Sequence, residues 1–314
     1  MQAVILGAGM GTRLRPVTAH RSKAMVPVLG RPLVERALLP FFENGVRDFV
    51  FVISPDDTEI TSHFTERTSL DITARFVIQE ERLGMAHALR LAAPLVDGRF
   101  VVSACDSLLD PAYVRKLFLV DDEADAVLSL LDVEPDKLCR SGVVELDGER
   151  IRRIVEKPSP GNAPSNTVSL PHYVFSPRLL ELLPSIKPSL RGEYEIQDAI
   201  QGLIDGDRTV IGVLADKRFQ VSSPEDLLEL THQLFSDGTE PRKIGPAVAS
   251  RGLNLVEPYH IERGAVLGDD CEIGPEAFLE SGCHIGDGAM VRRSVVLRGC
   301  QVARNEIVED RIVT

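Results

Sequence analysis

The strongest constraint on the fold is a six-residue period in the segment 253–314. A large aliphatic residue recurs at this interval at Ile261, Leu267, Ile273, Leu279, Ile285, Val291 and Leu297. The position four residues later holds mostly small residues, at Ala265, Cys271, Ala277, Cys283, Ala289 and Val295. A period of six matches neither a helix nor an ordinary strand. It is typical of a parallel β-helix with three short strands per coil, in which the aliphatic side chains stack inside, and its open end would suit oligomerisation.

The first 235 or so residues follow a different pattern. Short apolar runs, such as 4–6, 49–53, 75–78, 100–103, 126–131 and 173–175, alternate with longer segments of helical spacing. This alternation predicts an α/β domain with a mostly parallel mixed sheet covered on both faces. Ser223 and Pro224 begin a capped helix that closes the domain. The predicted domains are therefore 1–238 and 253–314, joined by a linker, 239–252, rich in turn-forming residues.

The first apolar run leads into a glycine-rich loop, LGAGMGTR, residues 6–13. Glycines allow positive φ angles, and successive N–H groups in such a turn form an anion site. The dinucleotide fingerprint GxGxxG fails because Thr12 stands at its third glycine, and the P-loop fails because no Gly-Lys pair follows. Arg13 and Lys23 add positive charge to the loop. The pattern therefore predicts a polyphosphate site.

Composition excludes several classes of partner. The net charge of −12 disfavours nucleic acid, because such a binding face needs clustered Lys and Arg. The five cysteines form no CxxC pair, which favours a reducing compartment without structural disulfides. No apolar run approaches the ~20 residues of a membrane helix, and nothing resembles a signal peptide. We therefore expect a cytoplasmic protein with no membrane partner.

Several motifs together resemble the sugar-1-phosphate nucleotidylyltransferases, also called nucleotide-sugar pyrophosphorylases. LGAGMGTRLRPVT followed by KAMVPVLGRPLVE resembles the N-terminal signature of that family. Other segments match in order: Gln79 with LGMAHAL (83–89), VVSACD (101–106), SGVV (141–144), IVEKP (154–158), RGEYEIQDA (191–199) and SPED (223–226). The resemblance implies a Rossmann-like nucleotidyltransferase domain followed by a short left-handed parallel β-helix of hexapeptide repeats.

The resemblance also implies the chemistry. A sugar-1-phosphate oxygen attacks the α-phosphorus of an NTP in line and pyrophosphate leaves, assisted by Mg²⁺, with no protein nucleophile. The implied catalytic residues are Arg13, Lys23 and Lys157. The implied nucleotide-binding residues are Leu6, Gly7, Ala8, Gly9, Gly11, Thr12, Gln79 and Gly84. The implied sugar-phosphate-binding residues are Gly142, Glu156, Lys157, Tyr173 and Arg191, and the implied metal ligands are Asp106 and Gln220.

The side chain of Gln79 offers both a donor and an acceptor, which suits the imide edge of uracil or thymine and favours UTP or dTTP. The sugar stays open, and a homo-oligomer is expected, through the β-helix. Arg15 and Arg21 have no assigned role, and Glu193, Glu195 and Asp198 are interpreted as structural because this chemistry needs no pair of acids.

Five positions depart from the family pattern. Ser22 stands where the family has a proline before the active lysine, Cys105 where it has a glycine before the metal-binding Asp106, and Pro171 where it has a glycine two residues before Tyr173. Gln220 and Ser222 replace the aspartate and the glycine of the second metal motif. A neutral amide should hold Mg²⁺ less tightly than a carboxylate. Two hypotheses therefore stand. The first is an active nucleotidylyltransferase, favoured by the retained phosphate-handling residues. The alternative is a non-catalytic regulatory subunit that binds a nucleotide sugar and acts on a related pyrophosphorylase.

Overall fold

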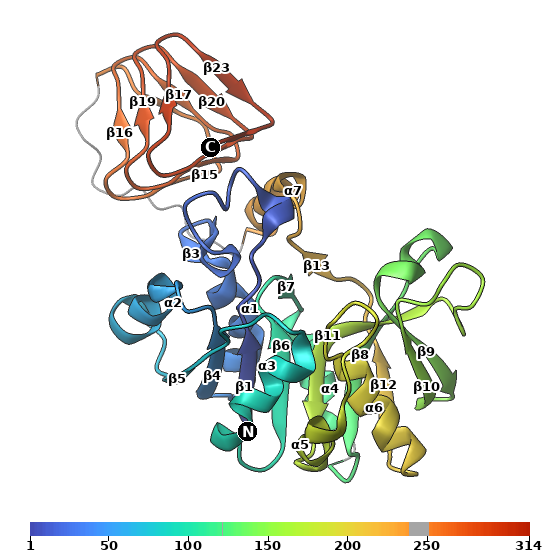
Figure 1. Cartoon of the computed structure of the whole chain (residues 1–314). Coiled ribbons are helices and arrows are strands. Elements are labelled where there is room, and N and C mark those ends of the chain that lie inside the picture. The colour runs from blue at the N-terminus through green and yellow to red at the C-terminus, as the bar shows by residue number, and fades with distance from the viewer. Residues whose placement is uncertain (121, 239–250) are drawn as a thin grey trace. The chain divides into compact units, whose positions relative to one another are not determined.

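A computed structural model of the chain describes residues 1–120, 122–238 and 251–314 (Figure 1). These residues form two compact units. Unit 1 comprises Met1–Gly9 and Val34–Phe219, and unit 2 comprises Met10–Leu33 and Gln220–Thr314. Most of the predicted linker, residues 239–250, lies outside the described residues. The segment 10–33, which contains most of the glycine-rich signature, therefore groups with the C-terminal residues rather than with the sheet.

Unit 1 is built on a nine-stranded sheet of order β5-β4-β1-β6-β11-β8-β12-β10-β9. Its strands are β1 Gln2–Leu6, β4 Asp48–Ile53, β5 Thr73–Ile78, β6 Phe100–Ala104, β8 Ala126–Asp132, β9 Gly142–Asp147, β10 Arg150–Glu156, β11 Thr167–Phe175 and β12 Val210–Leu214. The pairings of β10 and β11 with their neighbours are antiparallel, and β1, β4, β5, β6, β8 and β12 pair in parallel among themselves. Only β10 and β11 thus run against the others, which confirms the predicted mostly parallel mixed sheet.

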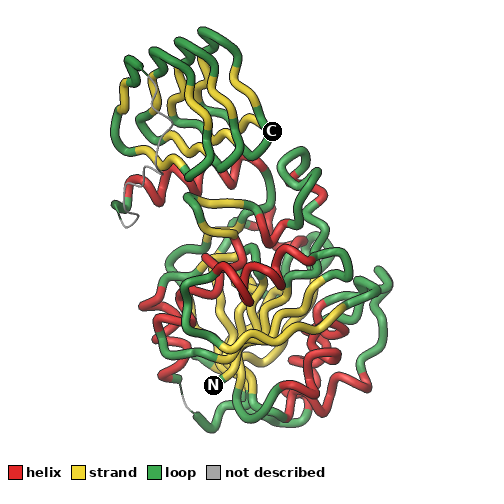
Figure 2. The backbone as a smooth tube through the Cα atoms, turned by 90° about the vertical axis from the view of Figure 1, so that its left-hand side faces the viewer, coloured by secondary structure: helices red, strands yellow, loops and turns green. Residues whose placement is uncertain are grey.

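Helices cover both faces of this sheet, as Figure 2 shows. They are α1 Leu33–Glu43, α2 Thr58–Ser62, α3 Met85–Ala92, α4 Pro111–Leu119, α5 Arg178–Leu182 and α6 Ile196–Asp205. Short helical turns span Ala93–Leu95, Pro135–Arg140, Leu183–Ser185 and, as a π-helix, His63–Arg67. Val50 packs with α3 and α6 in one core, whereas its neighbour Phe51 stacks on Phe64 at 4.3 Å. Successive residues of one strand are buried on opposite faces, so its sequence is a continuous apolar run.

The C-terminal part of unit 2, residues 254–314, consists of three parallel sheets and is called here the C-terminal stack. One sheet holds β14 Asn254–Leu255, β17 Glu272–Ile273, β20 Met290–Arg292 and β23 Ile307–Glu309. The second holds β15 Tyr259–Ile261, β18 Ala277–Leu279, β21 Val295–Val296 and β24 Ile312–Val313, and the third holds β16 Val266–Leu267, β19 His284–Ile285 and β22 Gln301–Val302. Consecutive strands enter the three sheets in turn, which is consistent with the predicted β-helix.

The six-residue period is confirmed up to Val291 and wrong after it. Leu279 lies opposite Ile261, 18 residues earlier, but Val296 rather than Leu297 lies opposite Leu279. The corner between β20 and β21 is one residue shorter than the corner between β17 and β18, so the following coil is displaced by one position. Residues 295–297 are all apolar, and the sequence therefore does not show which of them faces inward.

The rest of unit 2 is helix α7 Pro224–Ser236 and the loop 10–33. As predicted, Ser223 caps α7, and Asp226 completes a capping box. The loop contains one-turn helices at Thr12–Leu14 and Lys23–Met25 and a small hairpin of β2 Pro27–Val28 and β3 Arg31–Pro32. Two further short strands, β7 Ser107–Leu108 in unit 1 and β13 Phe219–Gln220, adjoin the predicted metal ligands. No helix of the described residues has the length and hydropathy needed to span a membrane.

Candidate functional site

The glycine-rich loop leaves β1 at a point that unit 1 holds firmly. The Gly7 N–H donates to the carbonyl of Val52, and the carbonyl of Ala8 accepts from Arg82 Nε at 2.8 Å and from Ser54 Oγ at 3.1 Å. Arg82 was not among the predicted residues, because nothing in the sequence connects it to a carbonyl 74 positions earlier. These contacts fix the direction in which the chain enters the loop.

Within unit 2 the loop brings Gly11 and Lys23 together. Gly11 has φ +60°, and a Cβ atom at this position would lie 2.8 Å from Lys23 Cβ. Thr18 Oγ1 donates to the Gly11 carbonyl at 2.9 Å, which closes the turn. Lys23 is 8% exposed, whereas Thr12 and Arg13 are exposed. Only glycine permits this close approach, so the loop is shaped around the buried stem of its lysine.

Gln79 and Gly84, the predicted base-recognition pair, lie together in unit 1. Gln79 Nε2 donates to the Gly84 carbonyl at 3.4 Å and contacts His87 Nδ1 at 3.1 Å. Burial, and secondarily Arg90, lower the pKa of His87. A neutral imidazole can accept the amide proton of Gln79, which orients that side chain. Sequence reasoning missed His87, because a histidine inside an apolar helix carries no sign of this contact.

Gly84 itself is required by its neighbours. It has φ +98°, and a Cβ atom there would lie 2.6 Å from the carbonyl oxygen of Tyr194. The Tyr194 N–H donates to the Leu83 carbonyl and its carbonyl accepts from the Ala86 N–H. The start of α3 is therefore bonded to the segment that leads into α6, which joins the base-recognition motif to the RGEYEIQDA motif.

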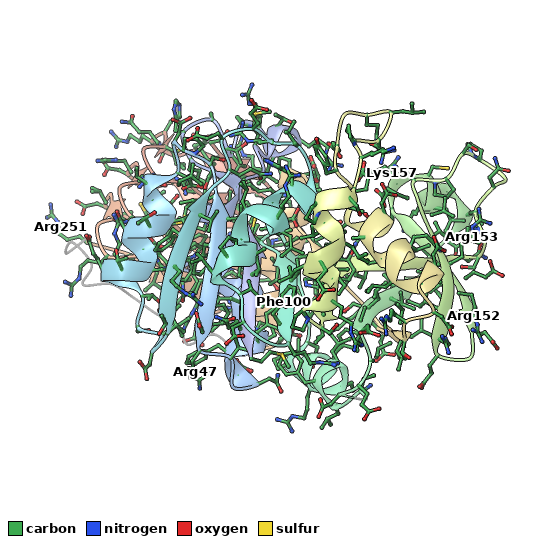
Figure 3. All side chains as sticks on the ribbon, turned by 60° about the horizontal axis from the view of Figure 1, so that its bottom comes forward. Arg47, Phe100, Arg152, Arg153, Lys157 and Arg251 are labelled. Carbon is green, nitrogen blue, oxygen red and sulfur yellow. The ribbon has the colours of Figure 1, made fainter. Side chains whose placement is uncertain are left out.

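Charged residues from two segments, the end of β10 and the RGEYEIQDA motif, meet at one point. Lys157 Nζ lies 3.3 Å from Glu156 Oε1, and Arg191 Nη2 lies 3.9 Å from the same oxygen. Arg191 is held by Glu195 at 2.7 Å, so Glu195 positions a predicted phosphate contact. Lys157 has φ +45°, an uncommon backbone conformation for this residue type. Figure 3 shows Lys157 at one end of the β9–β10 strand pair and Arg152 toward the other end.

Glu156 carries an unusual buried oxygen. No group of the described residues hydrogen-bonds its buried Oε2. A Cβ atom on Gly142, the glycine of the SGVV motif, would lie 3.1 Å from that oxygen and 3.0 Å from Gln197 Cγ, so a side chain there would crowd both. Burial raises the pKa of Glu156, while Lys157 lowers it and Glu195 raises it further. A buried acceptor without a partner costs about 1–3 kcal/mol, which a ligand hydroxyl would recover.

Tyr173 differs from the other predicted sugar-site residues. Its side chain is 1% exposed, and its phenolic oxygen accepts from Ser169 Oγ at 3.1 Å. Burial raises the pKa of Tyr173. The structure thus places its ring inside the core of unit 1, where it supports the strand rather than offering an accessible surface to a ligand.

Asp106 lies in the turn between β6 and β7, and a buried histidine spans the two ends of that turn. His172 Nδ1 is 2.9 Å from Ser103 Oγ, and His172 Nε2 is 2.8 Å from Ser107 Oγ. Burial, with a smaller effect of Arg218, lowers the pKa of His172 to about 3. The imidazole is therefore neutral and bonds both hydroxyls, which fixes the turn. The motif VVSACD indicated Asp106, but the histidine, 66 positions later, gave no signal.

The predicted metal ligands are a carboxylate and an amide. Asp106, half-buried in unit 1, lies within electrostatic range of the Arg218 guanidinium. Gln220 is half-buried and begins the second segment of unit 2. No cluster of three or more His, Cys, Asp or Glu side chains with metal-binding geometry occurs in the described residues. Carboxylate and amide oxygens are both donors that Mg²⁺ accepts, and the ion usually takes one or two protein oxygens and its remaining ligands from phosphate and water.

Family models match almost the whole chain. Residues 2–236 match the model described as Nucleotidyl transferase, and residues 255–314 match the GMPPB C-terminal domain. The chain belongs to the nucleotidyl transferase family. The first match spans both units, from β1 through the loop to α7.

Relatives of this nucleotidyl transferase include the UTP–glucose-1-phosphate uridylyltransferase AglF of Haloferax volcanii, 34% identical over 247 residues, which cover 76% of this chain and 99% of AglF. The glucose-1-phosphate thymidylyltransferase of Streptomyces griseus is 28% identical over 99% of this chain and 84% of its own length. A solved UDP-glucose pyrophosphorylase complexed with UDP-glucose has a TM-score of 0.69 at 22% identity, and the match covers 75% of this chain and 98% of that one. This last likeness shows the fold.

Proposed function

We propose that this nucleotidyl transferase joins an NTP to a sugar-1-phosphate and releases pyrophosphate. The observation that carries the proposal is the loop of unit 2, in which buried Lys23 lies against Gly11 beside exposed Arg13. Such a loop presents cations and backbone N–H groups to a polyphosphate. The names of the relatives, which include glucose-1-phosphate uridylyl- and thymidylyltransferases, support the same reaction class.

Catalysis would consist of positioning and charge neutralisation. Arg13 would stabilise negative charge on the leaving pyrophosphate, and Lys23 would contact the α-phosphate region. Lys157 would hold the phosphate of the sugar so that its oxygen faces the α-phosphorus in line. Both lysines are held by neighbouring residues: the stem of Lys23 packs on the Gly11 turn, and the ammonium group of Lys157 pairs with Glu156. No residue needs to form a covalent bond to substrate.

Substrate recognition would follow from two clusters of unit 1. Gln79, whose amide nitrogen is engaged by Gly84 and His87, would present its free amide oxygen to the imide N–H of uracil or thymine, favouring UTP or dTTP. The buried Oε2 of Glu156 would accept from a sugar hydroxyl, and Arg191 would add a phosphate contact. We infer glucose-1-phosphate as the first sugar phosphate to test, because both relatives named above act on it.

Asp106 and Gln220 would hold Mg²⁺. The ion would neutralise the phosphates of the NTP during transfer. His172 would keep the Asp106 turn fixed for this purpose through Ser103 and Ser107.

The proposed architecture has a catalytic domain, 1–238, a linker, 239–252, and a left-handed β-helix domain, 253–314. The three parallel sheets of the C-terminal stack and its match to the GMPPB C-terminal domain support the last of these. A homo-oligomer formed through this domain, working in the cytoplasm where nucleotide substrates are made, completes the proposal.

A second candidate, a non-catalytic regulatory subunit, is favoured by one observation: Gln220 stands where an anionic metal ligand is expected. The experiment that separates the two is pyrophosphate release with Mg²⁺, crossing UTP, dTTP, ATP, GTP and CTP with glucose-, N-acetylglucosamine- and mannose-1-phosphate. Release with one pair, best with UTP or dTTP, supports the enzyme. No release with any pair, while a nucleotide sugar binds the folded protein by calorimetry, supports the regulatory subunit.

A further inference from the structure

A buried ion pair joins the loop 10–33 to the C-terminal stack within unit 2. Arg21 Nη1 donates to Glu280 Oε1 at 2.7 Å, and Arg21 Nη2 donates to Glu280 Oε2 at 3.0 Å. The two side chains are 7% and 10% exposed. A bidentate guanidinium–carboxylate pair is both strong and directional. Because this pair is buried, removing one partner would leave an uncompensated charge away from water, which costs free energy.

The stack holds the carboxylate rigidly for this contact. Glu280 Oε2 also accepts from the Arg298 N–H at 2.7 Å, one coil further along. Glu262, one coil earlier, accepts from the Ser281 N–H at 2.9 Å, and burial raises the pKa of Glu262, with Glu280 acting in the same direction and Arg21 against it. Glu262 and Glu280 therefore form a fixed acidic surface on the stack, and the positive charge of Arg21 compensates their negative charge.

The loop touches the stack at a second point. The tip of the β2–β3 hairpin is Gly30, with φ +77°, and a Cβ atom there would lie 2.7 Å from His260 Nε2. His260 is 5% exposed and packs edge-on against Phe278 at 5.4 Å. His260 precedes Glu262 by two residues, and Phe278 precedes Glu280 by two, so both contacts fall on the same two neighbouring coils.

Lys23 lies between these two anchors. It follows Arg21 by two residues, begins the one-turn helix Lys23–Met25, and carries its stem against Gly11. With the chain fixed at Arg21 and at Gly30, the backbone of Lys23 has little freedom to move. A displacement of about 1 Å in such a group can cost about 10²-fold in rate.

We propose that Glu280 is a positioning residue for nucleotide binding, which acts through Arg21 to place Lys23. The inference rests on the proposed role of Lys23 at the NTP phosphates. It assigns the stack a part in the site, so that a carboxylate 257 positions from Lys23 in sequence sets the geometry of that lysine. The alternative is that the pair only joins two parts of unit 2 and leaves the loop geometry unchanged.

The decisive variant is Glu280→Gln, which keeps the shape of the side chain and one acceptor oxygen but removes the charge. The matched control is Glu272→Gln on the same stack, where Glu272 Oε1 accepts from Arg292 Nε at 2.8 Å. For Glu280→Gln we expect the Kd of the NTP, measured by calorimetry with Mg²⁺, to rise about tenfold. We expect kcat/KM for the NTP to fall by at least that factor, with KM for the sugar-1-phosphate changed less than twofold. The control should change each value less than twofold.

A third variant, Arg21→Lys, keeps the positive charge and loses the two-pronged contact, so we expect a defect smaller than that of Glu280→Gln. Hydrogen exchange of the peptides covering 10–33 should accelerate in Glu280→Gln and stay unchanged in Glu272→Gln. Weaker NTP binding by Glu280→Gln together with these exchange rates supports the inference. If the wild type also makes no product, the proposed catalysis fails but the inference stands. An active wild type with Glu280→Gln equal to Glu272→Gln in affinity, kinetics and exchange overturns the inference and leaves the proposed function standing.

Discussion

Substitution of Gly11 by alanine tests directly whether the loop is shaped around Lys23. Gly11 combines two features that only glycine accommodates: φ of +60° and a position where an added Cβ would lie 2.8 Å from Lys23 Cβ and 3.2 Å from Lys23 Cγ. Ordinary contact between such atoms begins near 3.5 Å. The lysine stem, or the turn closed by Thr18, therefore has to move by several tenths of an ångström or more.

The expected magnitude has two parts. A left-handed backbone costs a non-glycine residue about 1–2 kcal/mol, and this part acts on stability. The displacement of Lys23 acts on the rate, because a shift approaching 1 Å in a positioned group costs up to about 10²-fold. We expect Gly11→Ala to lower kcat/KM for the NTP by about 10- to 100-fold, while it lowers stability by about 1–2 kcal/mol.

Gly148→Ala is the matched control. Gly148 lies in the turn between β9 and β10 with φ +61°, and no heavy atom of the described residues beyond its chain neighbours lies within 4 Å of an added Cβ. Both variants therefore introduce the same backbone strain, and only Gly11→Ala introduces the collision with Lys23. Initial rates at varied NTP concentration and urea unfolding give the two quantities. Equal kcat/KM values for the two variants would refute the reasoning.

Three further predictions concern other parts of the site. Lys157→Ala should lower turnover at least 10²-fold, with a rise in KM for the sugar-1-phosphate, and an unchanged turnover in initial-rate assays would remove the assigned phosphate contact. Gln220→Asp should lower the Mg²⁺ concentration needed for half-maximal rate, because a charged oxygen binds the ion more tightly, and a titration with no shift would show that residue 220 is not a ligand. His172 stays neutral in the folded protein down to about pH 3, whereas the unfolded chain takes up a proton below about pH 6.5, so folded stability falls as pH drops through that range. The stability advantage of wild type over His172→Gln should therefore shrink by about 2 kcal/mol between pH 7.5 and pH 5 in urea unfolding, and a constant difference would contradict the buried neutral histidine.

The parts of the fold that could be predicted are those encoded by local repetition. Alternating apolar runs gave the mixed sheet, and the six-residue period gave the parallel stack. The period failed where one corner lost a residue, because Val295, Val296 and Leu297 are equally apolar and the phase depends on the length of that corner. The local pattern of residues predicts whether a segment is a helix or a strand better than it predicts the register in which a strand pairs.

The site shows the same division. The glycine-rich motif predicted a polyphosphate site to which Arg13 and Lys23 add positive charge. It did not predict that Gly11 packs on the stem of Lys23, a contact that the structure shows and that needs a residue without a side chain. The residues that support the site were missed, since each acts through a contact remote in sequence. Arg21 gave no sign of its partner Glu280, which lies 259 positions away. The sequence also did not indicate that His172 contacts Ser103 and Ser107 at the two ends of the Asp106 turn.

The central claim is direct transfer between bound substrates, in which positioned cations replace any protein nucleophile. It is tested most directly by the stereochemistry at the α-phosphorus. The substrate is a single diastereomer of UTP or dTTP that carries sulfur on the α-phosphorus, and ³¹P NMR gives the configuration of the product. A single in-line displacement inverts the configuration, and inversion is the result we predict. Retention would show two successive displacements through a covalent intermediate on the protein, and it would contradict the account.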